Sequence, residues 1–409
     1  MSWSPPPRPE WARNLIAHGE ALGDPDLLLP LEAEELVERA RRSTGLDDFG
    51  PDSDWKPHFE ILVEALARES RLHLIGRILA GTELLRSLCN RLRVTELWRR
   101  RPEILGTPID APVFIVGAAR SGTSITHELF ARDPASRVPL LWEMLHPAEA
   151  CEGPDLSEVA DHTMQFWHQL QPEYRAMHFN SGRLANECLH IFMQNFVSDQ
   201  FGGCHQVPTY EAHLQALDQR FVYAEHRRIL QTLEPGSRSA RWVLKAPSHL
   251  PRLRFLFSVY PDARIVWTHR DPQKTLASGL SLLGTLKWMR CAEVDLSPWI
   301  AALPAGQAWL FQDVIEAREK GELPDAQFID VRYADLMRDP ATTIADIYAR
   351  LGWDTSEPVS DAMRSYVENR PRGHHGRHVY SLAEFGLDSS VERERFASYR
   401  DRFGVPEEA

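Results

Sequence analysis

The sequence predicts an α/β fold in which helices cover a central parallel sheet, as a three-layer sandwich. Four short apolar segments, at residues 112–117, 241–245, 263–270 and 326–333, are each followed by a helical pattern. Strands that alternate with helices form βαβ units, and these units place their strands parallel in one sheet. Polar side chains stand at the end of each segment, and ligands of such sheets bind beyond the carboxyl ends of the strands. We therefore expect a binding site at that edge.

The chain is predicted to have two parts. Residues 1–107 form a helical region that packs on the core, and one of its helices keeps Leu36 on an apolar face and ends near Gly45. Residues 108–409 form the α/β domain. Within this domain, a segment at about 140–240 is rich in histidine, tryptophan, phenylalanine and methionine. It predicts a helical insertion that can line an acceptor pocket.

Composition excludes several classes of function. A formal net charge of -12 on 409 residues argues against a protein that binds nucleic acid along a basic surface. The five cysteines include no Cys-x-x-Cys pair, so we expect free thiols in a reducing compartment. The N-terminus lacks the layout of a signal peptide, and charges or prolines interrupt every apolar run. These observations predict a cytoplasmic protein without stable membrane insertion, and they leave the oligomeric state open.

The segment PVFIVGAARSGTS, residues 112–124, has the outline of a phosphate-binding loop. An apolar run ends at Gly117, and Gly122 follows at the start of a helical pattern. A Walker loop has a lysine after its second glycine, whereas Thr123 occupies that position here. Backbone N–H groups at a helix N-terminus favour a phosphate-like anion. The side chains that add hydrogen-bond donors are Arg120, Ser121, Thr123 and Ser124.

Two further strands also end in cationic side chains. Lys245 closes its strand, and His249 follows in the first turn of the next predicted helix. Arg270 ends the next strand, and Ser278 lies eight residues further along, two turns into the following helix. The alternative interpretation is structural: a solvated lysine, a histidine that packs in the protein, and an arginine that caps a helix. Because these residues share a place at the carboxyl ends of strands, a functional role is favoured.

Taken in this order, the three segments resemble the PAPS-dependent sulfotransferase superfamily, whose members transfer a sulfuryl group from 3′-phosphoadenosine-5′-phosphosulfate (PAPS). The resemblance covers roughly residues 108 to 400 and implies a P-loop-type fold. RSGTS is similar to the family's 5′-phosphosulfate loop, and THRDPQKTLAS is similar to its 3′-phosphate element. DVRYADLMRDP resembles a segment whose tyrosine lies near the nucleotide. The cofactor-binding residues that the resemblance implies are Arg120, Ser121, Gly122, Thr123, Ser124, Arg270, Ser278 and Tyr333.

A basic loop near the C-terminus is similar in place and character to the family's last phosphate-gripping loop. It adds Arg372 and Gly373 to the expected cofactor site, although the motif is not matched residue by residue. Histidines in the same loop do not cluster in sequence with a carboxylate or a cysteine, so the loop gives little support for a metal site.

The same resemblance implies catalytic roles. Lys245 matches the family lysine that supports the bridging oxygen as the S–O bond breaks. Two residues remain open as the base for the acceptor hydroxyl. His249 resembles the histidine of the soluble branch and has a suitable ordinary pKa, while Glu143 falls where Golgi-type enzymes place a catalytic glutamate. The residues expected to line the acceptor pocket are Arg183, Glu187 and His190.

The sequence thus predicts a sulfotransferase that moves a sulfuryl group from PAPS to a hydroxyl of a small-molecule, lipid or glycan acceptor and releases 3′,5′-bisphosphoadenosine (PAP). No metal is expected, because PAPS lacks the terminal phosphates that a Walker lysine and Mg²⁺ neutralise. A P-loop kinase-like phosphotransferase is the alternative enzyme, and Thr123 in the lysine position counts against it. A non-catalytic nucleotide-binding module is the alternative outside enzymology, and the pairing of Lys245 with His249 counts against that.

Overall fold

Parallel strands form the centre of the protein. In the computed structural model, which describes residues 3–234, 241–369 and 379–408, the strands are β1 (Val113–Val116), β2 (Ser136–Arg137), β3 (Arg241–Lys245), β4 (Arg264–His269) and β5 (Phe328–Arg332). Their order in the sheet is β2-β3-β1-β4-β5, and every neighbouring pair is parallel. The four predicted strands are confirmed. β2 was not predicted, because two residues are too few to give a periodic pattern.

The register of the sheet brings the polar strand ends to one edge. Ile115 of β1 lies opposite Lys245 of β3 on one side and Val266 of β4 on the other. β1 is therefore the central strand, and all its residues are buried. The loop after β1, the last residue of β3 and Arg270 just after β4 consequently share the carboxyl edge of the sheet.

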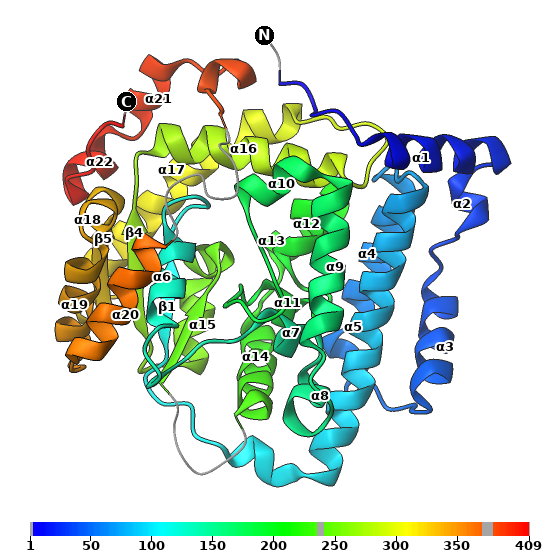
Figure 1. The fold of residues 1–409 in the computed structure, drawn as a ribbon, viewed down its shortest axis with the longest axis horizontal. Helices are drawn as coiled ribbons and strands as arrows, with labels where there is room; N and C mark the ends of the chain where they lie inside the picture. The colour runs from blue at the N-terminus through cyan, green and yellow to red at the C-terminus, as the bar shows by residue number, and fades with distance from the viewer. Residues whose placement is uncertain (1–2, 235–240, 370–378, 409) are drawn as a thin grey trace.

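Helices cover both faces of the sheet, which confirms the three-layer sandwich (Figure 1). Side chains such as Ile115 and Val266 pack with one helical layer, and Phe114 and Leu244 pack with the other. The first layer contains α6 (Thr123–Phe130), α18 (Tyr333–Arg338) and α19 (Pro340–Leu351), and the second contains α14 (Arg220–Leu233), α15 (Leu253–Val259) and α17 (Ser297–Glu319). The alternation of side chains along each strand thus supplies both layers of the core.

The N-terminal region is helical, as predicted. Its helices are α1 (Glu10–Leu22), α2 (Pro25–Leu28), α3 (Ala33–Thr44), α4 (Lys56–Arg68) and α5 (Leu74–Arg100). Gly45 ends α3 in the left-handed conformation, with φ of 69°, and Leu36 is buried. Leu84 and Leu88 of α5 belong to the same hydrophobic cluster as one face of the sheet. The division of the chain near residue 107 stays a prediction.

The segment between α6 and β3 is mostly helical, as expected for the insertion. It contains α7 (Leu141–Leu145), α8 (Pro147–Glu152), α9 (Ser157–Leu170), α10 (Pro172–Met177), α11 (Leu189–Phe192), α12 (Asp199–Cys204), α13 (Pro208–Ala216) and α14. The remaining α-helices are α16 (Pro272–Trp288), α20 (Glu357–Glu368), α21 (Ser389–Arg395) and α22 (Ala397–Phe403). The backbone N–H of Cys188, just before α11, donates to the carbonyl of Lys245 at 2.9 Å. This bond joins the insertion to the end of β3.

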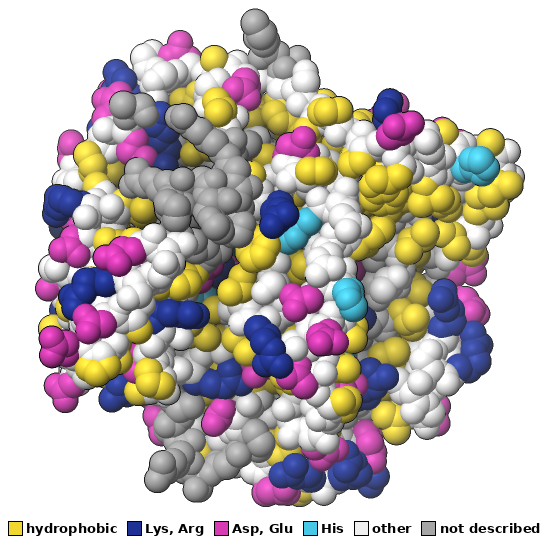
Figure 2. All heavy atoms as spheres, viewed as in Figure 1, with side chains coloured by type: hydrophobic (Ala, Val, Ile, Leu, Met, Phe, Trp, Pro, Cys, Tyr) yellow, Lys and Arg dark blue, Asp and Glu magenta, His cyan; other side chains and the backbone are white. Residues whose placement is uncertain are grey.

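The surface is mixed in charge, with one apolar region. Figure 2 shows acidic and basic side chains interspersed over one face, and hydrophobic side chains gathered around α1 and α2. Leu22 and Leu27 there are 73% and 82% exposed. Within the described ranges, no helix is both long enough and apolar enough to cross a membrane. The five cysteines are all free thiols.

Candidate active site

The loop between β1 and α6 has a backbone that requires glycine at two positions. Gly117 has φ of 151°, and a Cβ there would lie 2.5 Å from Thr268 Oγ1 and 2.6 Å from Ser121 Oγ. Gly122 has φ of 95°, and a Cβ there would lie 2.8 Å from the ring of Tyr333. Both glycines are therefore needed for the loop to turn into α6 while neighbouring side chains pack closely against it.

Arg120 reaches from this loop to α16. Its Nε donates to Ser278 Oγ at 3.2 Å, and its NH1 donates to the carbonyl of Met177 at 2.6 Å. The residue itself has a positive φ of 71°. Burial lowers the pKa of the Arg120 guanidinium, and the nearby charge of Arg270 lowers it further. Among the described residues no carboxylate forms an ion pair with Arg120, and two neighbouring arginines of which one is unpaired favour an anion between them.

Arg270 lies beside the same loop. Its NH1 donates to the carbonyl of Arg120 at 2.7 Å, and its guanidinium lies over the ring of Tyr333 at 4.1 Å. The other two nitrogens donate to the carboxylate of Glu408, each at 2.8 Å. Burial opposes the charge of Arg270, but the hydrogen bonds to Glu408 and the neighbouring tyrosines raise its pKa overall. Glu408 of the C-terminal tail thus pairs with Arg270, the arginine that the sequence analysis expected to bind the 3′-phosphate.

Lys245 forms an ion pair with Glu187 at the end of β3. The two side-chain atoms are 2.5 Å apart, and Lys245 Nζ also donates to Ser124 Oγ at 3.3 Å. Lys245 is 2% exposed and Glu187 is 15% exposed. Burial alone would raise the pKa of Glu187, but the charge and hydrogen bond of Lys245, together with His178 and His190 nearby, bring it below its usual value. Glu187 is therefore an ionised carboxylate beside a buried ammonium.

Two histidines complete this polar cluster. Burial lowers the pKa of His178 to about 4, and burial and Arg86 lower that of His190 to about 3. Glu187 opposes both shifts. Both imidazoles are therefore neutral at physiological pH, so the carboxylate of Glu187 is the anionic proton acceptor of the cluster.

His249 lies outside this cluster. Its side chain is fully buried, its Nδ1 lies 2.9 Å from Tyr223 OH, and its ring meets that of Phe114 edge-on at 4.9 Å. Burial lowers its pKa well below the ordinary value of 6.5. Among the hydrogen bonds of the described residues, none joins His249 to Lys245. The short 3-10 helix η4 (Pro247–Arg252) turns the imidazole into the core instead.

Glu143 and Arg183 form ion pairs with residues other than Lys245. Arg137 donates two hydrogen bonds to the Glu143 carboxylate, at 2.8 and 3.0 Å, and the backbone N–H of Leu140 donates a third at 2.8 Å. Since Arg137 lies on β2 opposite the start of β3, Glu143 caps α7 at a distance from the end of that strand. Arg183 is exposed and forms an ion pair with Asp155.

The other expected site residues lie as follows. Ser121 is buried and pairs with Thr268 at 2.7 Å, and Thr123 begins α6. Tyr333 lies against the loop at Gly122 and beneath the guanidinium of Arg270. Arg372 and Gly373 lie outside the described residues.

Sequence reasoning missed three features of this site. It placed Glu187 in the acceptor pocket without foreseeing its pairing with Lys245, because the two residues are 58 positions apart. It did not single out His178, which ends a short helix with no motif around it. Nor did it single out Glu408, since the tail after α22 has no pattern that indicates where it folds back.

Known proteins similar to this chain agree on one class. A sequence model of the sulfotransferase family matches residues 112–357. Omega-hydroxy-beta-dihydromenaquinone-9 sulfotransferase Stf3 of Mycobacterium bovis is 26% identical over 288 residues, which cover 63% of this chain and 67% of that protein. Since the family match spans more than half of the chain, the protein belongs to the sulfotransferase family.

Solved structures agree with this assignment. The sulfotransferase STF1 from Mycobacterium tuberculosis H37Rv is 31% identical, with a TM-score of 0.73 over 90% of this chain and 98% of that one. The sulfotransferase STF9 from Mycobacterium avium, at 23% identity, has the same fold, with a TM-score of 0.80 over 92% of this chain and 98% of that one. The predicted P-loop-type fold and the predicted class of enzyme, a PAPS-dependent sulfotransferase, are confirmed.

Proposed function

We propose that Lys245 and Glu187 carry out sulfuryl transfer from PAPS to an acceptor hydroxyl. The observation that carries this proposal is their 2.5 Å ion pair, which lies beside Ser124 of the phosphate-binding loop. A buried ammonium and an ionised carboxylate are the two groups that the reaction needs, one for the leaving group and one for the acceptor proton.

The loop receives the 5′-phosphosulfate in this proposal. Its backbone N–H groups stand at the N-terminus of α6, where the helix dipole favours an anion. Arg120 and the hydroxyl groups of Thr123 and Ser124 supply further donors. Because one phosphosulfate has a lower charge than a triphosphate, these groups suffice without a Walker lysine, and we propose that transfer requires no metal.

The chemical step moves one proton and exchanges one bond. The acceptor oxygen attacks sulfur in line, and a new S–O bond forms as the bond from sulfur to the bridging oxygen of the 5′-phosphate breaks. The hydroxyl proton passes to the Glu187 carboxylate. Lys245 stabilises the negative charge that develops on the phosphate of the departing PAP. Glu187 thereby takes the role for which the sequence had suggested His249 or Glu143.

The 3′-phosphate binds Arg270 and Ser278 in this proposal. Arg270 is held beside the loop by its hydrogen bond to Arg120, and Ser278 lies within reach of the Arg120 side chain. The Glu408 carboxylate accepts from guanidinium donors that a phosphate could also use. PAPS is therefore proposed to compete with Glu408 for Arg270.

The acceptor is proposed to be a hydroxyl on an apolar molecule, within the class of small molecules, lipids and glycans. The relative from Mycobacterium bovis is named for a hydroxylated menaquinone, which is a lipid. The apolar surface around α1 and α2 is compatible with such an acceptor. The proposal keeps a cytoplasmic location, which rests on the free cysteines.

Radiolabelled PAPS tests this function directly. The purified protein, incubated with ³⁵S-PAPS and a lipid extract, is expected to give labelled products, and the rate is expected to survive EDTA. PAP should also raise the melting temperature far more than AMP, because only PAP carries the 3′-phosphate. Transfer of phosphate from Mg-ATP without any transfer from PAPS would instead establish a kinase-like enzyme. Nucleotide binding without transfer to any acceptor would favour a binding module.

A further inference from the structure

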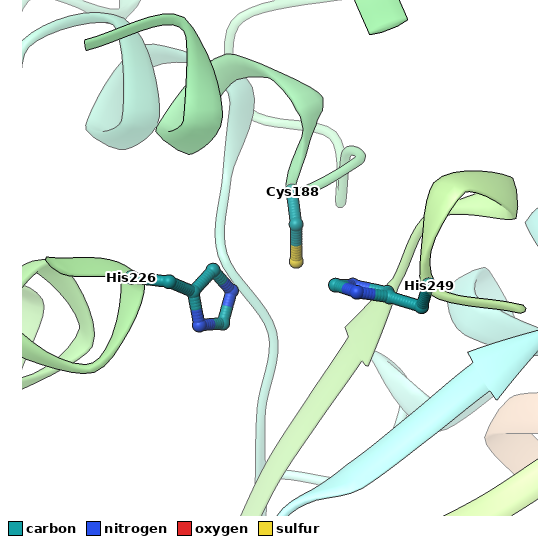
Figure 3. A group of neighbouring side chains, drawn as sticks. All are labelled: Cys188, His226 and His249. Carbon is teal, nitrogen blue, oxygen red and sulfur yellow. The ribbon is translucent and has the colours of Figure 1, made fainter. Parts of the chain in front are cut away.

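Three side chains that can ligate a metal meet in the core behind Lys245. Cys188 precedes α11, His226 lies on α14, and His249 lies in η4 after β3. All three are fully buried, and their ligand atoms lie within 4.8 Å of one another. Figure 3 shows the sulfur of Cys188 pointing between the two imidazole rings. Three separate elements therefore bring one thiol and two imidazoles to one point.

A tyrosine orients each imidazole. His249 Nδ1 lies 2.9 Å from Tyr223 OH, and His226 Nδ1 lies 2.8 Å from Tyr260 OH. With the proton on Nδ1, each ring donates to a tyrosine oxygen and keeps a free lone pair on Nε2. Metal-bound histidines are commonly fixed in this way by a second hydrogen bond.

The other nitrogen of each ring has no hydrogen-bond partner. His226 Nε2 and His249 Nε2 are both buried, and neither has a partner among the described residues. A buried polar atom without a partner is destabilising, and native structures leave few of them. A metal ion bound by both Nε2 atoms would remove this cost.

The surroundings of the cluster are aromatic. Phe114 packs on His249 with ring centroids 4.9 Å apart, and Phe192 packs on His226 at 5.3 Å. A cysteine binds a metal as its thiolate. Binding of a metal would therefore release one proton.

The charged side chains nearest to the cluster are already paired. Lys245 is neutralised by Glu187, and Arg252 donates to Asp199 at 2.6 and 2.8 Å. Cys188 is consequently the single anionic ligand that this cluster can offer. One thiolate neutralises a monovalent cation, whereas a divalent cation would leave a net positive charge in an apolar core.

We propose that Cys188, His226 and His249 bind one Cu(I) ion in a three-coordinate site. A thiolate and two imidazoles are ligands that soft metals select, and Cu(I) accepts three of them with no fourth ligand. Metal–ligand bonds of about 2.0 to 2.3 Å would place the three donor atoms about 3.6 Å apart. The donor atoms would have to approach one another by up to about 1.2 Å from the 4.8 Å limit.

The proposed ion is structural and takes no part in sulfuryl transfer. Its ligand Cys188 donates a backbone hydrogen bond to the carbonyl of Lys245. The ion would thus hold the backbone behind the end of β3. Because the cluster is separate from Lys245 and Glu187, the proposal does not depend on the proposed function.

Metal content and X-ray absorption of the whole protein test this site. We expect protein expressed with copper and zinc together to contain one copper per chain, in the Cu(I) state and without bound zinc. The copper absorption spectrum should show one sulfur and two nitrogen neighbours. This measurement on the unaltered chain does not depend on whether a variant folds. Zinc at one equivalent in place of copper would overturn the assignment of the ion, as would a shell of oxygen ligands.

Variants identify the ligands. Cys188→Ala and His226→Gln should each reduce bound copper at least tenfold under competition with a Cu(I) chelator. Cys89→Ala removes another buried cysteine away from the cluster and should keep one copper per chain. Equal copper in Cys188→Ala and the unaltered protein would overturn the site. So would the absence of copper after both expression and refolding with Cu(I) under anaerobic conditions.

Discussion

Glu187 and Cys188 are neighbours in the chain, yet they belong to two polar clusters with different electrostatics. Glu187 turns toward Lys245, where two opposite charges pair and 15% of the carboxylate side chain remains exposed. Cys188 turns toward His226 and His249, where neutral groups are sealed among aromatic rings. The first cluster faces the loop that is expected to bind the sulfuryl donor, while the second faces the core.

This difference shows that residue type does not decide which groups can act on a substrate. His249 has an ordinary pKa that suits a general base, but burial removes both its access and its basicity. Glu187 has an ordinary carboxylate, but its pairing with Lys245 keeps it ionised at the strand end. Solvent access and local charge therefore favour Glu187 over His249 as the proposed base.

Replacing Glu187, in the cluster with Lys245, should have the largest effect on the rate. Glu187→Gln keeps the shape of the side chain but cannot accept a proton, so kcat is expected to fall by roughly 10² to 10⁴. Steady-state rates with PAPS measure this loss. Glu143→Gln is the matched control and should retain kcat, since Glu143 caps α7. His249→Gln should lower the melting temperature yet change kcat by less than about tenfold; a greater loss than in Glu187→Gln would return the role of base to His249.

Replacing Lys245 should have the next largest effect. Lys245→Ala removes the cation that stabilises the departing phosphate, and kcat is expected to fall by roughly 10² to 10³. PAP affinity, measured by calorimetry, should change much less, because this charge matters most in the transition state. Lys245→Arg should recover part of the rate. A loss confined to PAP affinity, with kcat intact, would contradict a role in the chemical step.

Replacing Arg270 should weaken the binding of PAP but not that of AMP. A hydrogen bond to a charged group contributes about 1.5 to 3 kcal/mol, so Arg270→Ala should weaken PAP binding by roughly 10- to 100-fold. AMP lacks the 3′-phosphate, and its affinity should hardly change. Arg332→Ala removes an exposed arginine that pairs with Asp335 and serves as the control. Equal losses for PAP and AMP would show that Arg270 does not recognise the 3′-phosphate.

Replacing Glu408 should have a smaller effect of opposite sign. Glu408→Gln removes the carboxylate that competes for Arg270, and PAP affinity should rise by roughly two- to fivefold, as for a partly exposed ion pair. Calorimetric titration with PAP measures the change. Glu407→Gln removes a neighbouring carboxylate that pairs with Arg393 and should leave the affinity as it is. Weaker PAP binding in Glu408→Gln would mean that the tail assists the nucleotide.

Changing pH from 8 to 6 should have the smallest effect. The pKa of Glu187 lies below its usual value, so the carboxylate is ionised throughout this range and accepts the proton equally well. The rate should vary less than about twofold and should fall only once the pH is below the ordinary glutamate pKa of about 4.3. A rate that rises with pH through about 6.5 would indicate a histidine base with an unshifted pKa.

Much of the fold followed from the sequence because its signals are local. The apolar segments that became β1, β3, β4 and β5 are short, bounded by polar residues and followed by helices, so each pattern is complete within a few residues. Gly45 likewise ends its helix as its position indicated. β2 consists of two residues and depends on its pairing with β3, which no local pattern records.

The sequence could indicate candidate site residues only where they lie within a continuous motif. The loop from Arg120 to Ser124 and the pair of Arg270 and Ser278 lie within continuous segments, and the structure brings them together. The proposed base, Glu187, depends on contacts between distant segments. Four residues separate His249 from Lys245, yet the turn after β3 directs the imidazole away, while Glu187 arrives from the insertion. Spacing along the chain could not show that the His249 imidazole turns into the core or that Glu187 reaches Lys245.

The hydrogen bond from Arg270 to the carbonyl of Arg120 has a consequence for cofactor choice. It joins β4 to the loop after β1 at 2.7 Å, and the two strands are themselves paired along their length. The strand pairing and this bond from the Arg270 side chain to the loop backbone therefore limit how far the separation of the two anion sites can change. A regioisomer of PAP with the phosphate on the 2′-oxygen would present its two groups at a different spacing. The enzyme should discriminate against that isomer even though its charge and composition are identical.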